Sequence, residues 1–250
     1  MRVRFALLSL LNKYYKSLMN ASGVMLLFCS ARGGWIDHQL PNDLPLFDML
    51  NVRYFLGELG TKTELIPSLK KIASLDLNVY ESSKAWPRAF FTNRVTPYGG
   101  DSDFVRLLKE GDGTPFAAVP EEEMAKHAEL GSLTDHTSPS TDRRLVRATD
   151  YILTNNNTSF KVTAPAAGVM VLTEPYVEGD FQLRVNGKPT DYFRVNSAFR
   201  GVFLPEAGVY TFSFSYWPRH LTISLWISAI GIVSLLSWLG LSFKRGYREA

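Results

Sequence analysis

A stretch of uncharged, apolar residues near the C-terminus, Leu221–Leu241, constrains the fold of this chain more than any other feature. It contains no proline, and as an α-helix it would be about 30 Å long, which matches the hydrocarbon core of a bilayer. The alternative is a buried helix of a soluble protein, but such helices average about 11–12 residues and usually carry a polar stripe. The sequence therefore predicts one transmembrane helix over residues 220–242.

The residues on either side of this segment predict its orientation. Trp217 and Trp238 lie near its two ends, where amphipathic rings favour the headgroup layer of a bilayer. Lys244 and Arg245 follow it, in a short basic tail that spans residues 243–250. By the positive-inside rule, this tail stays in the cytoplasm and the rest of the chain lies outside. We expect these four side chains to anchor the helix in the lipid bilayer.

Composition restricts the class of the remaining chain. It has 250 residues with 46% hydrophobic content, which is enough for one or two packed domains beside the membrane helix. The net charge of +3 is mild and no Lys/Arg stripe is present, so nucleic acid is not an expected partner. Cys29 is the single cysteine, which excludes an intramolecular disulfide. The four histidines lack paired ligand spacing, so the sequence predicts no metal site and no cofactor.

The N-terminal segment, residues 1–34, resembles a signal peptide only in part. Arg2 and Arg4 precede a short apolar run, but polar residues interrupt that run too early for an export signal. Apolar residues recur at three- and four-residue steps over Phe5–Leu18, which predicts an amphipathic helix. Without an export signal, we expect earlier membrane helices of a longer protein to carry this region outside. The chain would then be the last part of a multi-span membrane protein.

Residues 35–130 predict a small α+β region. Residues 35–45 contain two prolines among polar residues, which indicates turns rather than a helix. Asp101–Lys109 predicts a helix that begins at a cap formed by Asp101 or Ser102. The polar residues 131–144 then predict a linker. Three segments in this region have the composition of strands: Val52–Leu56, Leu77–Tyr80 and Ala89–Val95.

Residues 145–219 predict an antiparallel β-sandwich. Strand-like runs alternate with turn signals, and Asn186-Gly187 is typical of a two-residue type I′ hairpin. The predicted fold is therefore mainly β, with an α+β N-terminal part, a jelly-roll-like sandwich and one C-terminal transmembrane helix. The six predicted strands are Ser159–Ala164, Val169–Glu174, Phe181–Asn186, Asp191–Val195, Phe199–Leu204 and Val209–Tyr216.

Several short motifs along the chain resemble, in order, the C-terminal part of the YfhO-type bacterial integral membrane proteins. Asp180 departs from the pattern, because an aromatic residue usually follows the glycine at the position of Gly179. Residues 1–34 show little resemblance. The motifs are Leu50-Asn51-Val52-Arg53-Tyr54, Val79-Tyr80-Glu81, Trp86-Pro87-Arg88-Ala89-Phe90, Val171–Tyr176 with Gly179, Asn186-Gly187-Lys188, Phe199–Gly208 and Tyr216-Trp217-Pro218.

This resemblance implies a function in the bacterial cell envelope. The family is regarded as GT-C-like glycosyltransferases, which use a lipid-linked sugar donor and act on envelope polymers. The resemblance implies a bacterial cytoplasmic membrane, with the remaining transmembrane helices of a parent protein as partners. In such enzymes the catalytic carboxylate lies on an early loop, so no catalytic residue is assigned to this chain. Whether the chain belongs to an enzyme is left open by the sequence.

Trp86, Arg88 and Tyr176 are the candidate residues for contact with a glycan or a lipid phosphate. Aromatic faces stack on sugar rings, and a guanidinium can bind a phosphate or carboxylate through two hydrogen bonds. The alternative interpretation places Trp86 and Tyr176 in the core and pairs Arg88 with an acid. Three functions stay open: part of a polytopic glycosyltransferase, a non-catalytic membrane-anchored carbohydrate-binding or scaffolding module, and a soluble β protein with a buried terminal helix.

Overall fold

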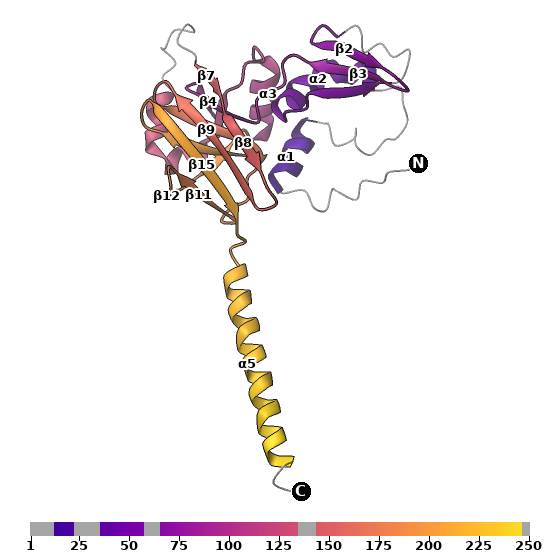
Figure 1. The fold of residues 1–250 in the computed structure, drawn as a ribbon. Coiled ribbons are helices and arrows are strands. Elements are labelled where there is room, and N and C mark those ends of the chain that lie inside the picture. The colour runs from indigo at the N-terminus through magenta and orange to yellow at the C-terminus, as the bar shows by residue number, and fades with distance from the viewer. Residues whose placement is uncertain (1–12, 23–35, 58–65, 135–143, 247–250) are drawn as a thin grey trace.

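The computed structural model describes residues 13–22, 36–57, 66–134 and 144–246. It consists of a folded head and one long helix, α5 (Leu221–Gly246), which extends away from the head (Figure 1). The head is mainly β, and its sheets are antiparallel apart from one parallel pair. The predicted fold class is therefore confirmed at the level of a β-rich head with one C-terminal apolar helix, whereas jelly-roll connectivity stays a prediction.

Two five-stranded antiparallel sheets form the sandwich. All six strands predicted between residues 145 and 219 are present, with ends shifted by at most two residues. One sheet has the order β13 (Phe193–Val195), β14 (Phe199–Leu204), β10 (Gly168–Pro175), β4 (Ala89–Thr92) and β7 (Leu145–Arg147). The other has the order β12 (Lys188–Thr190), β11 (Phe181–Val185), β15 (Gly208–Tyr216), β9 (Asn157–Ala164) and β8 (Thr149–Leu153).

The sheet that contains β10 is covered on both faces. Met170 and Leu172 of β10 point into the core between the two sheets, where they meet apolar residues of β9, β11 and β15. Val169 and Val171 point the other way, into a second core shared with helices. Because alternate side chains of a strand point to opposite faces, a strand with both faces covered must be apolar at nearly every position. β10 has this pattern.

Strand β4 links the middle of the chain to the sandwich. It pairs with β10 on one side and with β7 on the other, so one sheet contains residues from both sides of the 131–144 segment. The predicted strand Ala89–Val95 is thus two strands, β4 and β5 (Val95–Tyr98), separated by a turn. The four residues of β4 are all buried. Such a strand needs neighbours on both edges and cover on both faces, which only the larger sheet provides.

The second core lies between this sheet and an α+β layer. The layer contains a small antiparallel sheet in the order β1-β3-β2 and the parallel pair β5-β6. Its helices and remaining strands are α1 (Lys13–Ser22), α2 (Ile36–Met49), β1 (Tyr54–Gly57), β2 (Leu69–Ser74), β3 (Asn78–Ser82), α3 (Asp101–Glu110), β6 (Ala117–Pro120), α4 (Glu121–Lys126) and the short 3₁₀ helix η4 (Ala128–Leu133). Four of these were not predicted: α2, β2, β6 and η4.

The predicted turn over residues 35–45 is wrong, because residues 36–45 belong to helix α2; residue 35 lies outside the described residues. The helix contains both Pro41 and Pro45. Each proline removes a backbone hydrogen bond, which normally disfavours a helix. Here the burial of apolar side chains outweighs that loss, because Leu40, Leu44, Leu46 and Met49 are at most 6% exposed.

Two local predictions can be compared directly with the structure. The hairpin at Asn186-Gly187 is confirmed: both residues have positive φ, at 51° and 80°, and Val185 pairs with Lys188. The predicted side-chain cap of α3 is wrong. The cap residue is Gly100, which makes no side-chain cap bond. The Asp101 carboxylate instead accepts hydrogen bonds from hydroxyl groups of α1 and of the β13–β14 turn, so it joins elements rather than capping its own helix.

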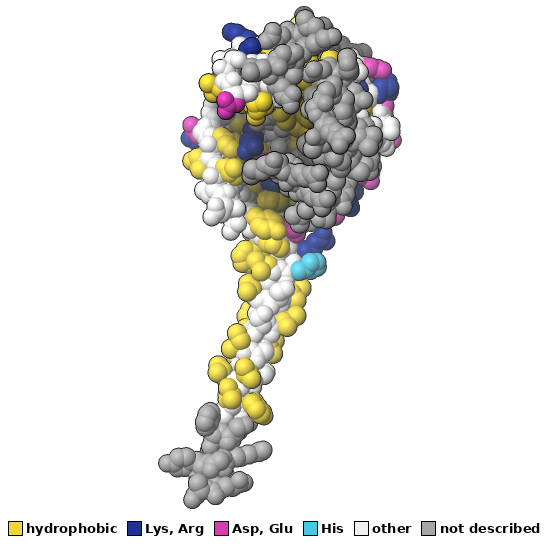
Figure 2. Space-filling model, turned by 90° about the vertical axis from the view of Figure 1, so that its right-hand side faces the viewer, with side chains coloured by type: hydrophobic (Ala, Val, Ile, Leu, Met, Phe, Trp, Pro, Cys, Tyr) yellow, Lys and Arg dark blue, Asp and Glu magenta, His cyan; other side chains and the backbone are white. Residues whose placement is uncertain are grey.

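Helix α5 includes the predicted membrane segment. Leu221–Gly240 is long and apolar enough to cross a bilayer, and none of it is buried against the head. Figure 2 shows hydrophobic side chains along the part of the helix whose side chains are described. Arg219 and His220 directly precede the helix in sequence. A soluble protein would not expose such a surface to water, so the alternative of a buried terminal helix is not what the structure contains.

Candidate functional site

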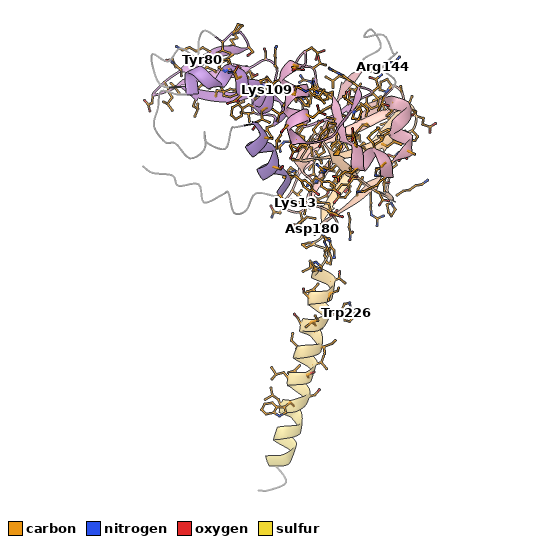
Figure 3. All side chains as sticks on the ribbon, turned by 180° about the vertical axis from the view of Figure 1, so that it is seen from behind. Lys13, Tyr80, Lys109, Arg144, Asp180 and Trp226 are labelled. Carbon is orange, nitrogen blue, oxygen red and sulfur yellow. The ribbon has the colours of Figure 1, made fainter. Side chains whose placement is uncertain are left out.

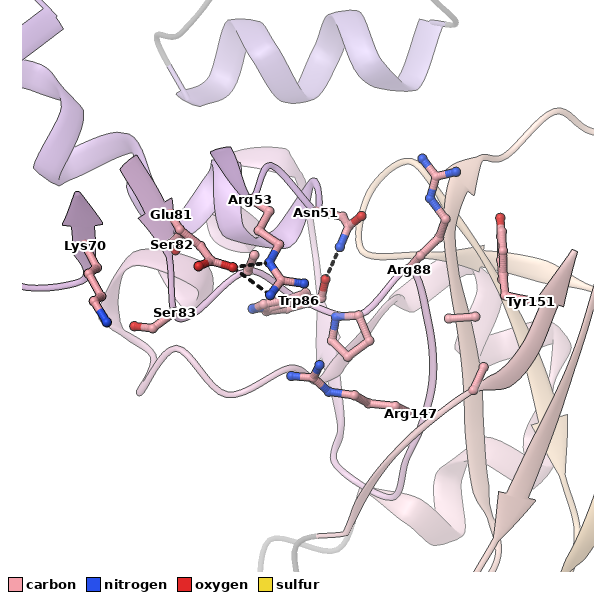
Figure 4. Close-up of a pocket in the computed structure, with 14 residues that line it drawn as sticks. Asn51, Arg53, Lys70, Glu81, Ser82, Ser83, Trp86, Arg88, Arg147 and Tyr151 are labelled. Atoms are coloured by element: carbon pink, nitrogen blue, oxygen red, sulfur yellow. Dashed lines mark hydrogen bonds and ion pairs between the residues drawn. The ribbon is translucent and has the colours of Figure 1, made fainter. Parts of the chain in front are cut away.

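A hollow of about 490 Å³ lies between the small sheet and the sandwich (Figure 4). It is formed by the end of β3, the following segment through β4, and the β7–β8 edge of the sandwich. We call it the basic hollow. Its charged and aromatic lining residues are Arg53, Lys70, Glu81, Trp86, Arg88, Arg147 and Tyr151.

The basic hollow carries an excess of positive charge. Four basic side chains line it, and Glu81 is the one carboxylate among the lining residues. Glu81 forms an ion pair with Arg53, at 2.6 Å. Lys70 lies opposite Glu81 in the β2–β3 pair, but no ion pair joins the two side chains in the described structure, and the lining has no further carboxylate for Arg88 or Arg147. Close like charges repel, so an anionic ligand would be attracted to this position.

Trp86 forms the floor of the hollow and is a core residue. Only 2% of it is exposed, and its ring packs edge-on against Phe90 and Phe116, with centroid distances of 6.0 and 5.4 Å. Its backbone is held on both sides: the amide N–H donates to the Asp48 carbonyl at 2.8 Å, and the carbonyl accepts from the Asn51 side chain. The fixed position of Trp86 shapes the hollow, while its ring contributes mainly to the core.

Arg88 is exposed and lies beside Tyr151. The guanidinium carbon is 5.8 Å from the centre of the Tyr151 ring, within range of a cation–π contact. The Tyr151 hydroxyl donates to Glu174 at 2.5 Å. Burial and this carboxylate raise the pKa of Tyr151 to about 12, so the phenol is neutral at physiological pH. Tyr151 therefore orients Arg88 without neutralising it.

Tyr176 lies away from the other two candidates. It is 8% exposed and contacts Tyr14 of α1 and Tyr192, each at a centroid distance of 5.6 Å. Burial and nearby carboxylates raise its pKa well above the usual value. The structure thus brings Trp86 and Arg88 together in one hollow and places Tyr176 in a separate aromatic cluster.

The predicted anchor residues lie on or next to α5. Trp217 is 42% exposed just before the helix, and its indole N–H donates to Thr222 at 3.0 Å. Trp238 is exposed near the other end. Lys244 and Arg245 belong to the last turns of α5, and their side chains lie outside the described part of the structure.

Sequence reasoning missed most of the basic lining. Arg53, Lys70, Arg147 and Tyr151 come from four separate segments and have no common spacing that would have identified them as one site. Arg53 alone stood in a motif that the sequence analysis had noted. Among the described residues, no group of three or more His, Cys, Asp or Glu side chains is arranged to hold a metal ion.

The chemistry of the hollow suits binding better than bond making. Its polar groups are guanidinium, ammonium, hydroxyl and amide donors, and its one carboxylate is already paired with Arg53. Lys70 and Tyr151 are the other titratable lining groups besides the arginines, and neither forms a hydrogen bond or ion pair with Glu81 in the described structure. In comparisons with known proteins, no family model, no curated protein and no solved structure matches this chain. The YfhO-type resemblance therefore stays a prediction.

Proposed function

We propose that this chain is a membrane-anchored, extracytoplasmic module that binds an anionic glycan in the basic hollow. The observation that carries the proposal is the group of three basic residues, Lys70, Arg88 and Arg147, around a hollow whose single carboxylate is paired with a fourth, Arg53. Arginine forms paired hydrogen bonds with carboxylate or phosphate groups, and the Tyr151 ring offers an apolar face to a sugar.

The position of the hollow favours a polymer of the envelope over a membrane lipid. In Figure 3, Tyr80 and Arg144 lie at the end of the head away from α5, and both are near the lining residues in sequence. If α5 crosses the bilayer with its basic tail inside, this end faces the envelope. The lipid headgroups of the outer leaflet would then lie at the other end of the head, where α5 departs. We therefore assign the hollow to a ligand that arrives from outside the membrane.

A second candidate function is the C-terminal part of a polytopic, GT-C-like glycosyltransferase. One observation favours it: three of the motifs that resemble the YfhO-type proteins meet at the basic hollow. They contribute Asn51, Arg53, Glu81, Trp86, Pro87, Arg88 and Ala89 to its lining. In such a protein the hollow would hold a lipid-linked sugar donor or a polymer acceptor beside a catalytic core carried by other segments.

Binding to the full chain in nanodiscs tests the proposal. Acidic oligosaccharides that carry uronate or phosphate groups should bind, and neutral oligosaccharides of the same length should not. Arg147→Gln should weaken binding about tenfold, since one charge-assisted hydrogen bond is lost. Arg184→Gln is the matched control, because Arg184 is exposed on β11 and bonds only to the nearby hairpin in the described structure. Equal binding of neutral and acidic sugars, or equal effects of both variants, would contradict the proposal.

The two candidate functions differ in what precedes the chain. In-frame apolar segments encoded upstream of Met1 would support the glycosyltransferase, and an unrelated gene there would support the anchored module. Both require the same orientation. Protease added to intact cells should digest the head and leave the basic tail protected; the opposite pattern would contradict both.

A further inference from the structure

A second hollow, of about 550 Å³, lies at the end of the head from which α5 departs. Figure 3 places Lys13 and Asp180 at this end, just before the helix begins. We call it the neck hollow. Its charged lining residues are Lys13, Glu178, Asp180, Arg200 and Arg219, and three aromatic rings complete it.

The neck hollow is tied directly to the start of the membrane helix. The Trp217 amide N–H donates to the Asp180 carbonyl at 2.8 Å, and the Arg219 amide N–H donates to the Asp180 carboxylate at 3.2 Å. The Arg219 guanidinium donates to the Glu178 carbonyl at 3.0 Å and crosses Gly179, whose φ is +76°. These hydrogen bonds join the lining of the neck hollow to Trp217 and Arg219, which lie just before Leu221, the first residue of the apolar segment. In a membrane, that position is the headgroup layer.

Arg200 forms the inner wall of the neck hollow, and its positive charge already has a carboxylate partner. It is 2% exposed, and its guanidinium lies 3.4 Å from the centre of the Phe181 ring and 3.5 Å from the Glu174 carboxylate. Its Nε also donates to the Pro175 carbonyl at 2.9 Å. Arg200 therefore holds the wall together and is not the group that a ligand would meet first.

The accessible charges of the neck hollow have both signs. Lys13 and Arg219 are exposed cations, Glu178 is an exposed carboxylate and Asp180 is half-buried. A purely anionic group would meet two carboxylates here, and a purely cationic group would meet two cations. A ligand with a phosphate and an ammonium group a few bonds apart satisfies both pairs. The exposed Tyr216 ring can also contact an ammonium through its face.

We infer that the neck hollow binds the headgroup of a zwitterionic phospholipid that carries a primary amine. Lys13 and Arg219 bind the phosphate, and Asp180 and Glu178 accept hydrogen bonds from the ammonium. A choline headgroup has no N–H to donate, and a glycerol headgroup has no positive charge, so both bind more weakly. The inference rests on the proposed anchoring of α5 in a bilayer, and it is independent of the glycan proposed for the basic hollow.

Native mass spectrometry of the full chain, released from nanodiscs, tests this inference. The nanodiscs contain equal amounts of phosphatidylethanolamine, phosphatidylcholine and phosphatidylglycerol. We expect one phosphatidylethanolamine to be retained per chain, about tenfold over either competitor. Asp180→Asn should remove the preference, because the amide can still accept from the Arg219 N–H but no longer carries charge. Glu206→Gln is the matched control, since Glu206 lies in the turn before β15, at the opposite end of that strand from the neck.

The outcomes separate this inference from the anchoring on which it rests. Equal retention of the three lipids by the wild-type chain, or equal behaviour of the two variants, would overturn the headgroup assignment. A chain that does not float with vesicles after alkaline extraction would overturn the anchoring itself, and the headgroup assignment with it. Lys13→Gln gives a second measurement on the phosphate side and should lower retention of all three lipids, whereas Lys188→Gln should not.

Discussion

The buried turn between β13 and β14 offers a quantitative test of how the layers of the head are joined. Asn196 is fully buried in this turn, with a φ of 49°. Its side-chain oxygen accepts from the Ala118 N–H at 2.7 Å, and its side-chain nitrogen donates to the Phe116 carbonyl at 3.0 Å. The side chain thus pairs with the backbone leading into β6 as a neighbouring strand would, and it connects the sandwich to the α+β layer.

We predict that Asn196→Ala lowers the free energy of unfolding by about 3–7 kcal/mol. The substitution leaves one buried donor and one buried acceptor without partners, at about 1–3 kcal/mol each. It also forces alanine into the left-handed region, at about 1 kcal/mol. Asn196→Gly avoids the second cost and should be about 1 kcal/mol less destabilising than Asn196→Ala. The difference between these two variants measures the backbone contribution alone.

The assay is urea unfolding of the full chain in a mild detergent, followed by tryptophan fluorescence. Asn186→Ala is the matched control, because Asn186 has a φ of 51° and accepts from the Thr211 N–H at 2.8 Å, but on an exposed hairpin. Asn186→Ala should lower the unfolding free energy by only about 1–2 kcal/mol, since water can replace the lost hydrogen bond. If Asn196→Ala lowers the unfolding free energy no more than Asn186→Ala does, the buried hydrogen bonds of Asn196 do not stabilise the contact between the layers.

Three further predictions concern the core and its titration. Asp48→Asn should reduce the pH dependence of the unfolding free energy at pH values above the ordinary aspartate pKa of 3.8. Burial raises the pKa of Asp48, so the folded state binds this proton more tightly than the unfolded state, and the unfolding free energy of the wild-type chain falls as the pH rises through that range; urea titrations at several pH values measure this. Gly168→Ala should cost about 1–3 kcal/mol in the same assay, because a Cβ would lie 2.4 Å from the Phe91 ring, whereas Gly131→Ala meets nothing within 4 Å. Trp86→Phe should cost about 1–3 kcal/mol yet weaken binding of the acidic sugar less than Arg147→Gln; a larger effect on binding would make the indole a recognition group.

Local sequence patterns predicted the structure correctly where that structure is determined by residues close together in the chain. The alternation of apolar and polar residues over Val209–Tyr216 predicts a strand with one buried face, and β15 has it. The positive φ values at Asn186-Gly187 follow from the residue types. The long apolar helix α5 follows from the uninterrupted run of apolar residues. The same reasoning failed at Pro41 and Pro45, because helix α2 is held by burial against residues far along the chain.

The residues of the candidate site likewise divide into those that the sequence identified and those that only the fold brings together. Arg88 could be singled out in the sequence because an arginine beside tryptophan and proline suggests a binding surface, but its three basic neighbours in the hollow could not. Lys70, Arg147 and Arg53 lie on different strands or loops, and only sheet pairing and the docking of the small sheet bring them together. Tyr176 was grouped with Trp86 by residue type alone, and the fold separates them.

The sequence by itself determined several elements: an apolar helix of membrane length, six strands of the sandwich and the hairpin at Asn186-Gly187. The tertiary structure decided which side chains share a surface, both in the basic hollow and in the neck hollow. The reason is that an element depends on residues a few positions apart. A hollow is lined by residues up to about two hundred positions apart, as Lys13 and Arg219 are in the neck hollow.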